Sequence, residues 1–251
     1  MRKPLQGVAN IVRFNWHYYV LAVGFLWMLI AFGNYVGGMT RILLLFLCLP
    51  AFVSILVSLA VSFYVYDLSN LYSLEWLGKK RFEKGSRLVN INAGFDETTE
   101  LLHLRFPKAE IAVLDFYDPA KHTEISIKRA RKAYPPFAGT IQIKTSAMSL
   151  ETDSAEAIFV ILAAHEIRKP EERAEFFREL ERILAPGGQI FVTEHLRDLP
   201  NVLAYTFGAF HFHSRRSWIK AFEAARLKIA GEIMITPFIT TFILESNGTA
   251  T

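Results

Sequence analysis

The sequence contains a single cysteine among 251 residues, which excludes an intrachain disulfide and a thiolate metal cluster. No acidic residue precedes Asp67. The same stretch contains four cations: Arg2, Lys3, Arg13 and Arg41. Residues 1–66 therefore carry +4, and the other 24 Lys and Arg (28 − 4) balance the 24 Asp and Glu. Because the basic charge belongs to this quarter alone, we expect no nucleic-acid partner for the rest of the chain.

Charge is also scarce relative to apolar residues. Charged residues make up 21% of the chain, and the mean hydropathy is +0.24, which is too apolar for an ordinary cytosolic enzyme of this size. Two runs, residues 17–38 and 42–66, lack charge altogether. At a rise of about 1.5 Å per residue, each run is long enough for a hydrocarbon core. Residues 1–66 are therefore predicted to form a transmembrane helical hairpin.

The cations around the two runs indicate the orientation of the hairpin. Three cations precede the first run, one lies between the runs, and five follow the second: Lys79, Lys80, Arg81, Lys84 and Arg87. Because positive flanks stay in the cytoplasm, we expect a two-pass protein of the cell inner membrane with a cytoplasmic N-terminus and cytoplasmic catalytic domain. Residues 67–86 space their leucines as an interfacial linker helix would.

From residue 87 onward, short apolar runs alternate with amphipathic stretches, which is typical of a parallel sheet with crossover helices. We expect seven strands, at residues 87–92, 110–115, 140–144, 157–163, 189–194, 229–235 and 240–245. We expect helices at residues 96–105, 125–133, 171–184, 202–210 and 215–225. The sequence thus predicts one α/β, Rossmann-like domain over residues 87–246 and a disordered tail at 247–251.

Two segments carry a family resemblance. Residues 179–194, ELERILAPGGQIFVTE, combine a helix end, a Pro-Gly-Gly turn and a strand, and residues 153–162, DSAEAIFVIL, combine an acidic lead-in with a strand. Both resemble the class I S-adenosylmethionine-dependent methyltransferases. The resemblance covers roughly residues 88–244 and implies a seven-stranded methyltransferase sheet with an antiparallel last strand and S-adenosylmethionine as the cofactor. A nicotinamide enzyme is disfavoured because Gly-x-Gly-x-x-Gly is absent.

The resemblance also implies a cofactor site. Gly94 is the one glycine in the turn after the first strand, where the backbone would hold the methionine carboxylate. Asp115 ends the second strand about 20 residues later and would bind the ribose, with Asp118 as second candidate. Capping of the next turn is the structural alternative for Asp115. Ser146 and Ala147 take the adenine position, where an acid is commoner. The implied cofactor-binding residues are Asn92, Ala93, Gly94, Asp115, Ser146, Ala147 and Ala163.

Four of the seven histidines follow the fourth and fifth strands, at the edge where open parallel sheets bind ligands. Three interpretations stay open: a general base on an acceptor hydroxyl, a divalent metal site without a recognised spacing motif, or a buried polar network. The predicted catalytic residues are His165, His195 and Glu194, and no metal ligand is assigned. The predicted substrate-binding residues are Glu166, Arg168, Arg197, Tyr205, His211 and His213.

The connector over residues 201–213 is unusually apolar, and its aromatic rings are expected either to line a hydrophobic cleft or to rest on the bilayer. The sequence therefore predicts a membrane-anchored methyltransferase for a lipophilic small-molecule acceptor that is phenolic, quinone-like or lipid-linked. The alternative is a catalytically inactive, methyltransferase-like membrane interaction module, which the incomplete glycine turn motivates. The bilayer and the acceptor are the expected partners, and the sequence does not fix the oligomeric state.

Overall fold

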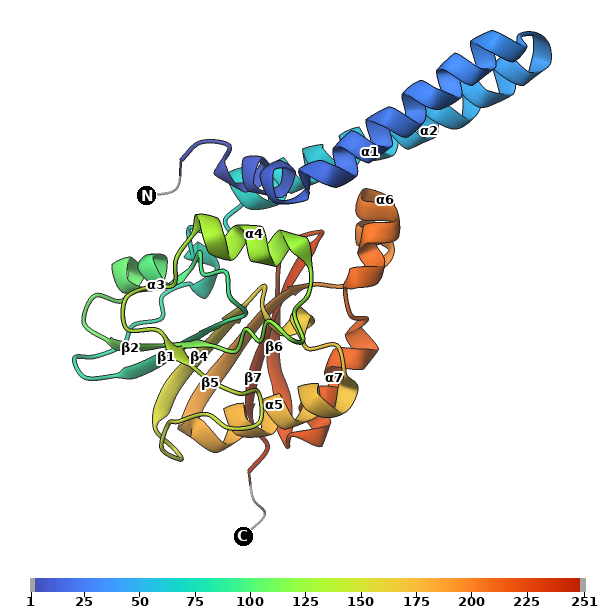
Figure 1. Cartoon of the computed structure of the whole chain (residues 1–251). Coiled ribbons are helices and arrows are strands. Elements are labelled where there is room, and N and C mark those ends of the chain that lie inside the picture. The colour runs from blue at the N-terminus through green and yellow to red at the C-terminus, as the bar shows by residue number, and fades with distance from the viewer. Residues whose placement is uncertain (1–2, 249–251) are drawn as a thin grey trace.

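The computed structural model describes residues 3–248, so part of the predicted tail, residues 249–251, lies outside the described chain. Its seven-stranded sheet has the order β3-β2-β1-β4-β5-β7-β6 (Figure 1). The strands are β1 (Arg87–Asn92), β2 (Glu110–Asp115), β3 (Ile141–Gln142), β4 (Ala155–Ile161), β5 (Leu184–His195), β6 (Leu227–Thr236) and β7 (Ile239–Ser246). Neighbours from β3 to β5 pair in parallel, and β7 runs antiparallel to both β5 and β6. The predicted Rossmann-like sheet with an antiparallel last strand is confirmed.

Helices and loops cover both faces of this sheet. They are α3 (Thr99–Arg105), α4 (Ile125–Ala133), α5 (Pro170–Ile183), α6 (Leu199–Tyr205) and α7 (Arg215–Ala224). The larger core packs α5 and α7 on one face through rings such as Phe176, Phe177 and Trp218. The second core packs α3 and the segment after the hairpin on the other face. Burial of both faces explains why the central strands read as continuous apolar runs.

The prediction of an interfacial helix over residues 67–86 is wrong. The segment contains only the end of a short π-helical turn, η1 (Tyr64–Leu68), and one 3₁₀ turn, η2 (Glu75–Leu77). Leu74 and Gly78 have positive φ of 56° and 62°, which a continuing helix does not allow. Leu71, Leu74 and Leu77 are buried in the second core, so their spacing serves burial against the sheet instead of a membrane surface.

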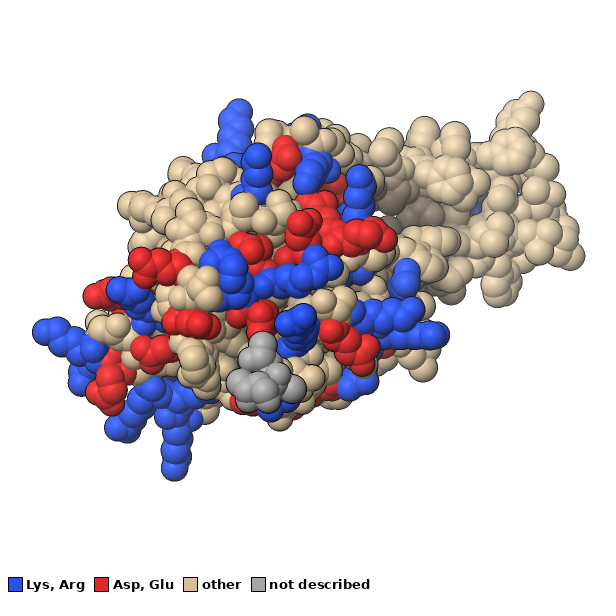
Figure 2. All heavy atoms as spheres, turned by 90° about the horizontal axis from the view of Figure 1, so that it is seen from below, with Lys and Arg blue, Asp and Glu red and all other residues tan. Residues whose placement is uncertain are grey.

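The first two helices, α1 (Gln6–Val36) and α2 (Gly38–Phe63), extend away from the sheet as an antiparallel pair (Figure 1). Both are long and apolar enough to cross a membrane by length and composition, and few of their residues are buried. The visible face of the pair carries almost no charge, whereas the domain is covered by mixed charges (Figure 2). The pair is compatible with a membrane anchor.

The start of α1 is attached to the domain. α1 bends at Asn15, and the part before the bend lies over α4 (Figure 1). The backbone N–H groups of Gly7 and Val8 donate to the two carboxylate oxygens of Asp67, at 2.7 and 2.8 Å. A carboxylate at a helix N-terminus satisfies otherwise unpaired donors and interacts favourably with the helix dipole. The hairpin is therefore fixed at both its beginning and its end.

Gly7 is the residue that allows this approach, because a Cβ there would lie 2.4 Å from Cβ of Tyr66. We expect Gly7→Ala to lower the free energy of unfolding by about 1–3 kcal/mol through overpacking. Gly24→Ala, in the same helix, is the matched control because its Cβ would meet nothing within 4 Å. Thermal unfolding of the full chain in detergent measures both. Equal stability of the two variants would show that the Gly7 contact does not hold the hairpin.

Candidate functional site

The turn after β1 is shaped by a glycine that no other residue can replace. Gly94 has φ of +92°, and a Cβ there would lie 2.8 Å from Cγ of Tyr117. The Asn92 Oδ1 accepts a hydrogen bond from the Gly94 N–H at 3.0 Å. Asn92, Ala93 and Gly94, which the sequence assigned to the cofactor, are buried together at this turn. The turn therefore brings backbone close to the carboxyl end of β2.

Asp96 follows this turn, and only one of its two carboxylate oxygens is hydrogen-bonded within the described residues. Its Oδ1 accepts from the N–H groups of Thr98 and Thr99, both at 3.0 Å, and so begins α3. Its Oδ2 is buried and has no hydrogen-bond partner among residues 3–248. Asp96 also lines a cavity of about 180 Å³ together with Glu97 and Glu100. A buried carboxylate oxygen beside an acid-lined cavity suits a cationic group such as an α-ammonium.

Asp115 is buried at the end of β2 and is engaged by its own chain. Its Oδ1 accepts from the Tyr117 N–H at 2.8 Å, which is the turn-capping alternative, and its Oδ2 forms an ion pair with Arg131 of α4. The Arg131 guanidinium also lies 4.6 Å from the centre of the Tyr117 ring. A carboxylate has about four lone-pair sites, so ribose hydroxyls can still bind beside Arg131. Asp118 instead accepts from the Ala120 N–H in its own turn.

The remaining residues assigned to the cofactor are spread along the sheet edge. Ser146 and Ala147 are exposed in the turn after β3, and Ala163 is buried just after β4. These positions offer no carboxylate to an adenine. The turn at Gly94, the free oxygen of Asp96 and the buried Asp115 nevertheless fit an amino acid joined to a ribose.

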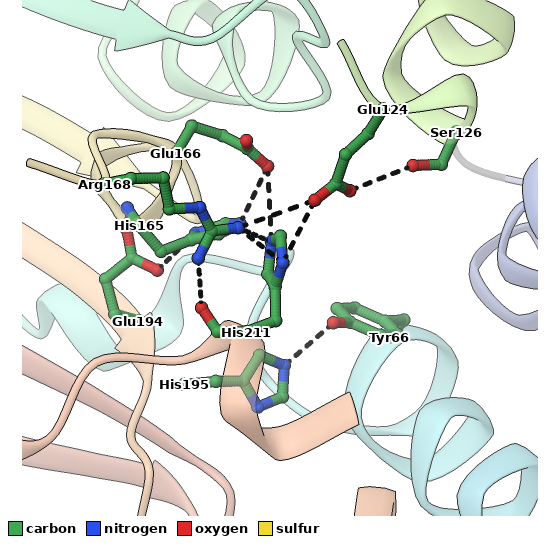
Figure 3. Close-up of polar contacts among 9 residues, drawn as sticks. All are labelled: Tyr66, Glu124, Ser126, His165, Glu166, Arg168, Glu194, His195 and His211. Atoms are coloured by element: carbon green, nitrogen blue, oxygen red, sulfur yellow. Dashed lines mark hydrogen bonds and ion pairs between the residues drawn. The ribbon is translucent and has the colours of Figure 1, made fainter. Parts of the chain in front are cut away.

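The histidines after β4 and in the connector meet carboxylates (Figure 3). His165 Nδ1 lies 2.7 Å from Oε2 of Glu194, and its backbone N–H donates to the other Glu194 oxygen at 3.1 Å. His165 Nε2 and His211 Nε2 lie 3.4 and 3.5 Å from the same oxygen of Glu166. Glu124 approaches His211 Nδ1 from the start of α4, at 3.3 Å. The convergence of His165 and His211 predicted from topology is present.

The carboxylates of this cluster keep the His165 imidazole protonated. Burial alone would lower the pKa of His165, but the neighbouring Glu194 and Glu166 outweigh it and raise that pKa to about 10. Burial would raise the pKa of Glu166, but hydrogen bonds to His165 and His211 hold it well below its usual range. At neutral pH, His165 is therefore an imidazolium, which donates hydrogen bonds and cannot accept a proton.

His195 is the opposite case. It is buried at the end of β5, where its Nδ1 lies 3.0 Å from Oδ1 of Asn201 and its Nε2 lies 2.8 Å from the hydroxyl of Tyr66 (Figure 3). Burial, opposed by the hydrogen bond to Asn201, lowers the pKa of His195 to about 4. Because the amide oxygen of Asn201 only accepts, Nδ1 carries the proton, and the Tyr66 hydroxyl donates to the lone pair of Nε2. His195 is thus a neutral imidazole whose Nε2 is hydrogen-bonded to the phenol hydroxyl of Tyr66.

The other predicted acceptor-side residues divide into two groups. Tyr205 and Phe212 pack around the His195 ring, with centroids 5.4 and 4.6 Å away, and Arg168 donates to the His211 carbonyl oxygen at 2.5 Å. His213 faces the other way. Its Nε2 contacts Arg173 at 2.9 Å, and burial followed by the charge of Arg173 lowers its pKa to about 3, so it belongs to a buried network. Arg197 is exposed, and only its backbone reaches His213.

Sequence reasoning missed three residues of the site: Tyr66, Arg131 and Glu124. Each reaches the site from an element outside the strand ends, so strand topology gave no signal for it. Asp96 was missed as well, but it could have been found, because an Asp shortly before a helix with threonines at its start is a helix-start pattern.

Comparisons with known proteins agree with this geometry. Residues 89–192 match a family model described as "Methyltransferase domain". These residues form a methyltransferase domain. A search of curated proteins finds no match to the chain. One similar solved structure is a chain from the complex between the Haloferax volcanii Trm112 methyltransferase activator and a candidate methyltransferase, at 13% identity and a TM-score of 0.53, covering 73% of this chain and 91% of that one.

A second similar structure is a SAM-dependent methyltransferase from Aquifex aeolicus, at 13% identity and a TM-score of 0.51, covering 72% of this chain and 94% of that one. At this identity the structures show the fold, and the family model shows the domain. The predicted enzyme class, an S-adenosylmethionine-dependent methyltransferase, and its cofactor are confirmed.

An alanine substitution at Gly94 tests whether the turn after β1 holds the cofactor. We expect Gly94→Ala to weaken the binding of S-adenosylhomocysteine by about tenfold or more, because the new Cβ strains the backbone and displaces Tyr117. Gly187→Ala is the matched control, since Gly187 also has positive φ, of +77°, but open space around it. Isothermal titration of the full chain in detergent measures both affinities. Unchanged binding by Gly94→Ala would place the cofactor elsewhere.

The charge of His165 makes stability depend on pH. Its pKa in the folded chain is about 10, above its ordinary value of 6.5, so the protonated form stabilises the fold. That contribution is complete below pH 6.5 and is lost as the pH rises from 6.5 through 10. We expect the stability difference between wild type and His165→Gln to shrink over this window in thermal unfolding. A difference independent of pH would contradict a charged His165.

Proposed function

We propose that the chain is a membrane-anchored methyltransferase whose lipophilic small-molecule acceptor enters from the bilayer at the edge formed by Tyr66 and His195. One observation carries the proposal. Tyr66, at the end of the second apolar helix, is hydrogen-bonded to His195 at the end of β5 (Figure 3). The proposed anchor therefore contributes directly to the acceptor side of the methyltransferase domain.

The exposed residues around this edge support access from lipid. Leu199, Leu203, Phe207 and Phe210, on α6 and the following 3₁₀ segment η4 (Thr206–His211), are at least 66% exposed. This segment packs beside α2. Clustered exposed apolar side chains of this kind mark membrane or partner contacts. Of the four rings expected to line a cleft or rest on a membrane, Phe207 and Phe210 point outward, whereas Tyr205 and Phe212 surround His195.

The cations of the sequence support the orientation that we propose. The flanks of the hairpin carry the positive charge, and the methyltransferase domain follows the second flank. A two-pass anchor in the cell inner membrane with both flanks in the cytoplasm satisfies this distribution. The domain would then lie at the cytoplasmic surface of the bilayer.

Different residues of the site bind the cofactor, remove the acceptor proton and hydrogen-bond the acceptor oxygen. Gly94, Asp96 and Asp115 would hold S-adenosylmethionine, which supplies a methyl group on a sulfonium when bound. The hydroxyl of Tyr66 takes the proton of an acceptor hydroxyl while its own proton passes to Nε2 of the neutral His195. His165, held as a cation by Glu194, donates a hydrogen bond to the acceptor oxygen. A phenolic, quinone-like or lipid-linked acceptor carries such an oxygen.

A second candidate function also has an observation in its favour. Tyr117 covers Gly94 and Arg131 pairs with Asp115, so the cofactor turn is closed by the chain itself. A catalytically inactive membrane interaction module would keep these contacts permanently. Methyl transfer to a lipid extract distinguishes the two functions.

We expect the full chain in detergent to transfer labelled methyl groups from S-adenosylmethionine to a lipid-extractable product. Tyr66→Phe should lower kcat by about 10²-fold or more, because it removes the hydroxyl bonded to His195. Tyr64→Phe is the matched control. Tyr64 lies two residues before Tyr66 in the sequence, and its ring packs against Phe238. Binding of S-adenosylhomocysteine should stay unchanged in both variants. Full activity of Tyr66→Phe would contradict the proposed proton path, and binding without methyl transfer in wild type would favour the inactive module.

A further inference from the structure

We propose that His165, Glu166 and His211 form a binding site for one divalent cation of the size and ligand preference of Zn²⁺. His165 and Glu166 belong to a 3₁₀ turn after β4, η3 (Ala164–Glu166), and His211 ends the connector segment η4 (Figure 3). The ligand atoms of the three side chains all lie within 4.8 Å of one another. The fold therefore assembles two imidazoles and one carboxylate that no local sequence motif links.

The spacing of these atoms suits a tetrahedral ion. Nε2 of His165 and Nε2 of His211 lie 3.4 and 3.5 Å from one oxygen of Glu166. A tetrahedral ion with bonds of about 2.0–2.1 Å holds its ligand atoms roughly 3.3–3.4 Å apart. Three protein ligands leave a fourth position for water or for an oxygen of a bound molecule. The arrangement is that of an open site.

A buried carboxylate fixes the orientation of one ligand. Glu194 has a side chain only 1% exposed, and it lies 2.7 Å from Nδ1 of His165. This hydrogen bond turns Nε2 of His165 toward Glu166. A metal ion bound there would displace the proton that Nε2 carries in the metal-free chain, so the charged and the metal-bound forms of His165 are alternatives. A carboxylate behind the distal ring nitrogen is the usual support of a metal-binding histidine, because it sets the tautomer and strengthens the ligand.

The local charges also favour a cation. Three carboxylates, those of Glu124, Glu166 and Glu194, contact the two histidines, and one guanidinium, that of Arg168, joins them. Arg168 lies 2.5 Å from Nε2 of His211 and so competes for that nitrogen. Its side chain is 40% exposed and can turn into solvent when a metal ion takes its place. Ligands and competitor therefore respond oppositely to mutation.

The test measures metal binding alone, without cofactor or acceptor, so its result does not depend on the proposed methyl transfer. Full-length protein in detergent is stripped with a chelator and titrated with Zn²⁺ against a chromophoric indicator. We expect one site in wild type. His211→Ala and the isosteric Glu166→Gln should each weaken it by about 100-fold or more, and Glu194→Gln by about 10–100-fold.

Two further variants complete the design. His103→Ala removes a histidine of α3 that stacks on Phe137, and it should leave Zn²⁺ affinity unchanged. Arg168→Ala removes the competing guanidinium and should tighten binding. Thermal unfolding verifies that each variant is folded, and Zn²⁺ should raise the melting temperature of wild type but not of Glu166→Gln. The proposal is overturned if wild type has no site, or if Glu166→Gln and His211→Ala bind Zn²⁺ as His103→Ala does.

Discussion

The contact between the start of α1 and η1, the short turn that follows α2, is the constraint on which the arrangement of the site depends. The Asp67 carboxylate accepts hydrogen bonds from the backbone N–H groups of Gly7 and Val8. Because Gly7 has no side chain, α1 can approach Tyr66 closely. The contact holds Tyr66 where its hydroxyl meets His195. It also lays the first turns of α1 over α4, the helix from which Arg131 reaches Asp115. This one contact thus connects the hairpin, the sheet edge at His195 and the buried Asp115.

Burial acts differently on two histidines at this edge. His165 lies beside carboxylates that outweigh its desolvation, and its pKa rises to about 10. His195 has amide and phenol partners, which carry no charge, and its pKa falls to about 4. Two imidazoles at the ends of neighbouring strands can thereby act as hydrogen-bond donor and proton acceptor at one pH, as divergent environments allow. The carboxylates that charge His165 are also those that would attract a metal ion.

The sequence predicted the sheet because its signals are local: apolar runs of strand length, amphipathic helices and the Pro-Gly-Gly turn. β1, β2 and α4 have the predicted bounds. The convergence of His165, His195 and His211 was also predictable, since the carboxyl ends of parallel strands share an edge. Residues 67–86 were misread because their leucine spacing suits either a helix or burial along a sheet. Tyr66 and Arg131 were not predictable, because their partners lie 129 and 16 residues away and meet only in the packed fold.

The central claim is that the acceptor edge of the methyltransferase domain lies at the bilayer surface. The single cysteine makes a direct measurement practical, because Cys48→Ala gives a background for labelling single sites. A spin label at position 207, on the exposed connector, is compared in nanodiscs with one at Lys228 on β6, which is 53% exposed by its side chain. The account predicts that lipid-soluble oxygen relaxes the label at 207 and that an aqueous nickel chelate relaxes only the label at 228. Equal access of the aqueous reagent to both labels would contradict it.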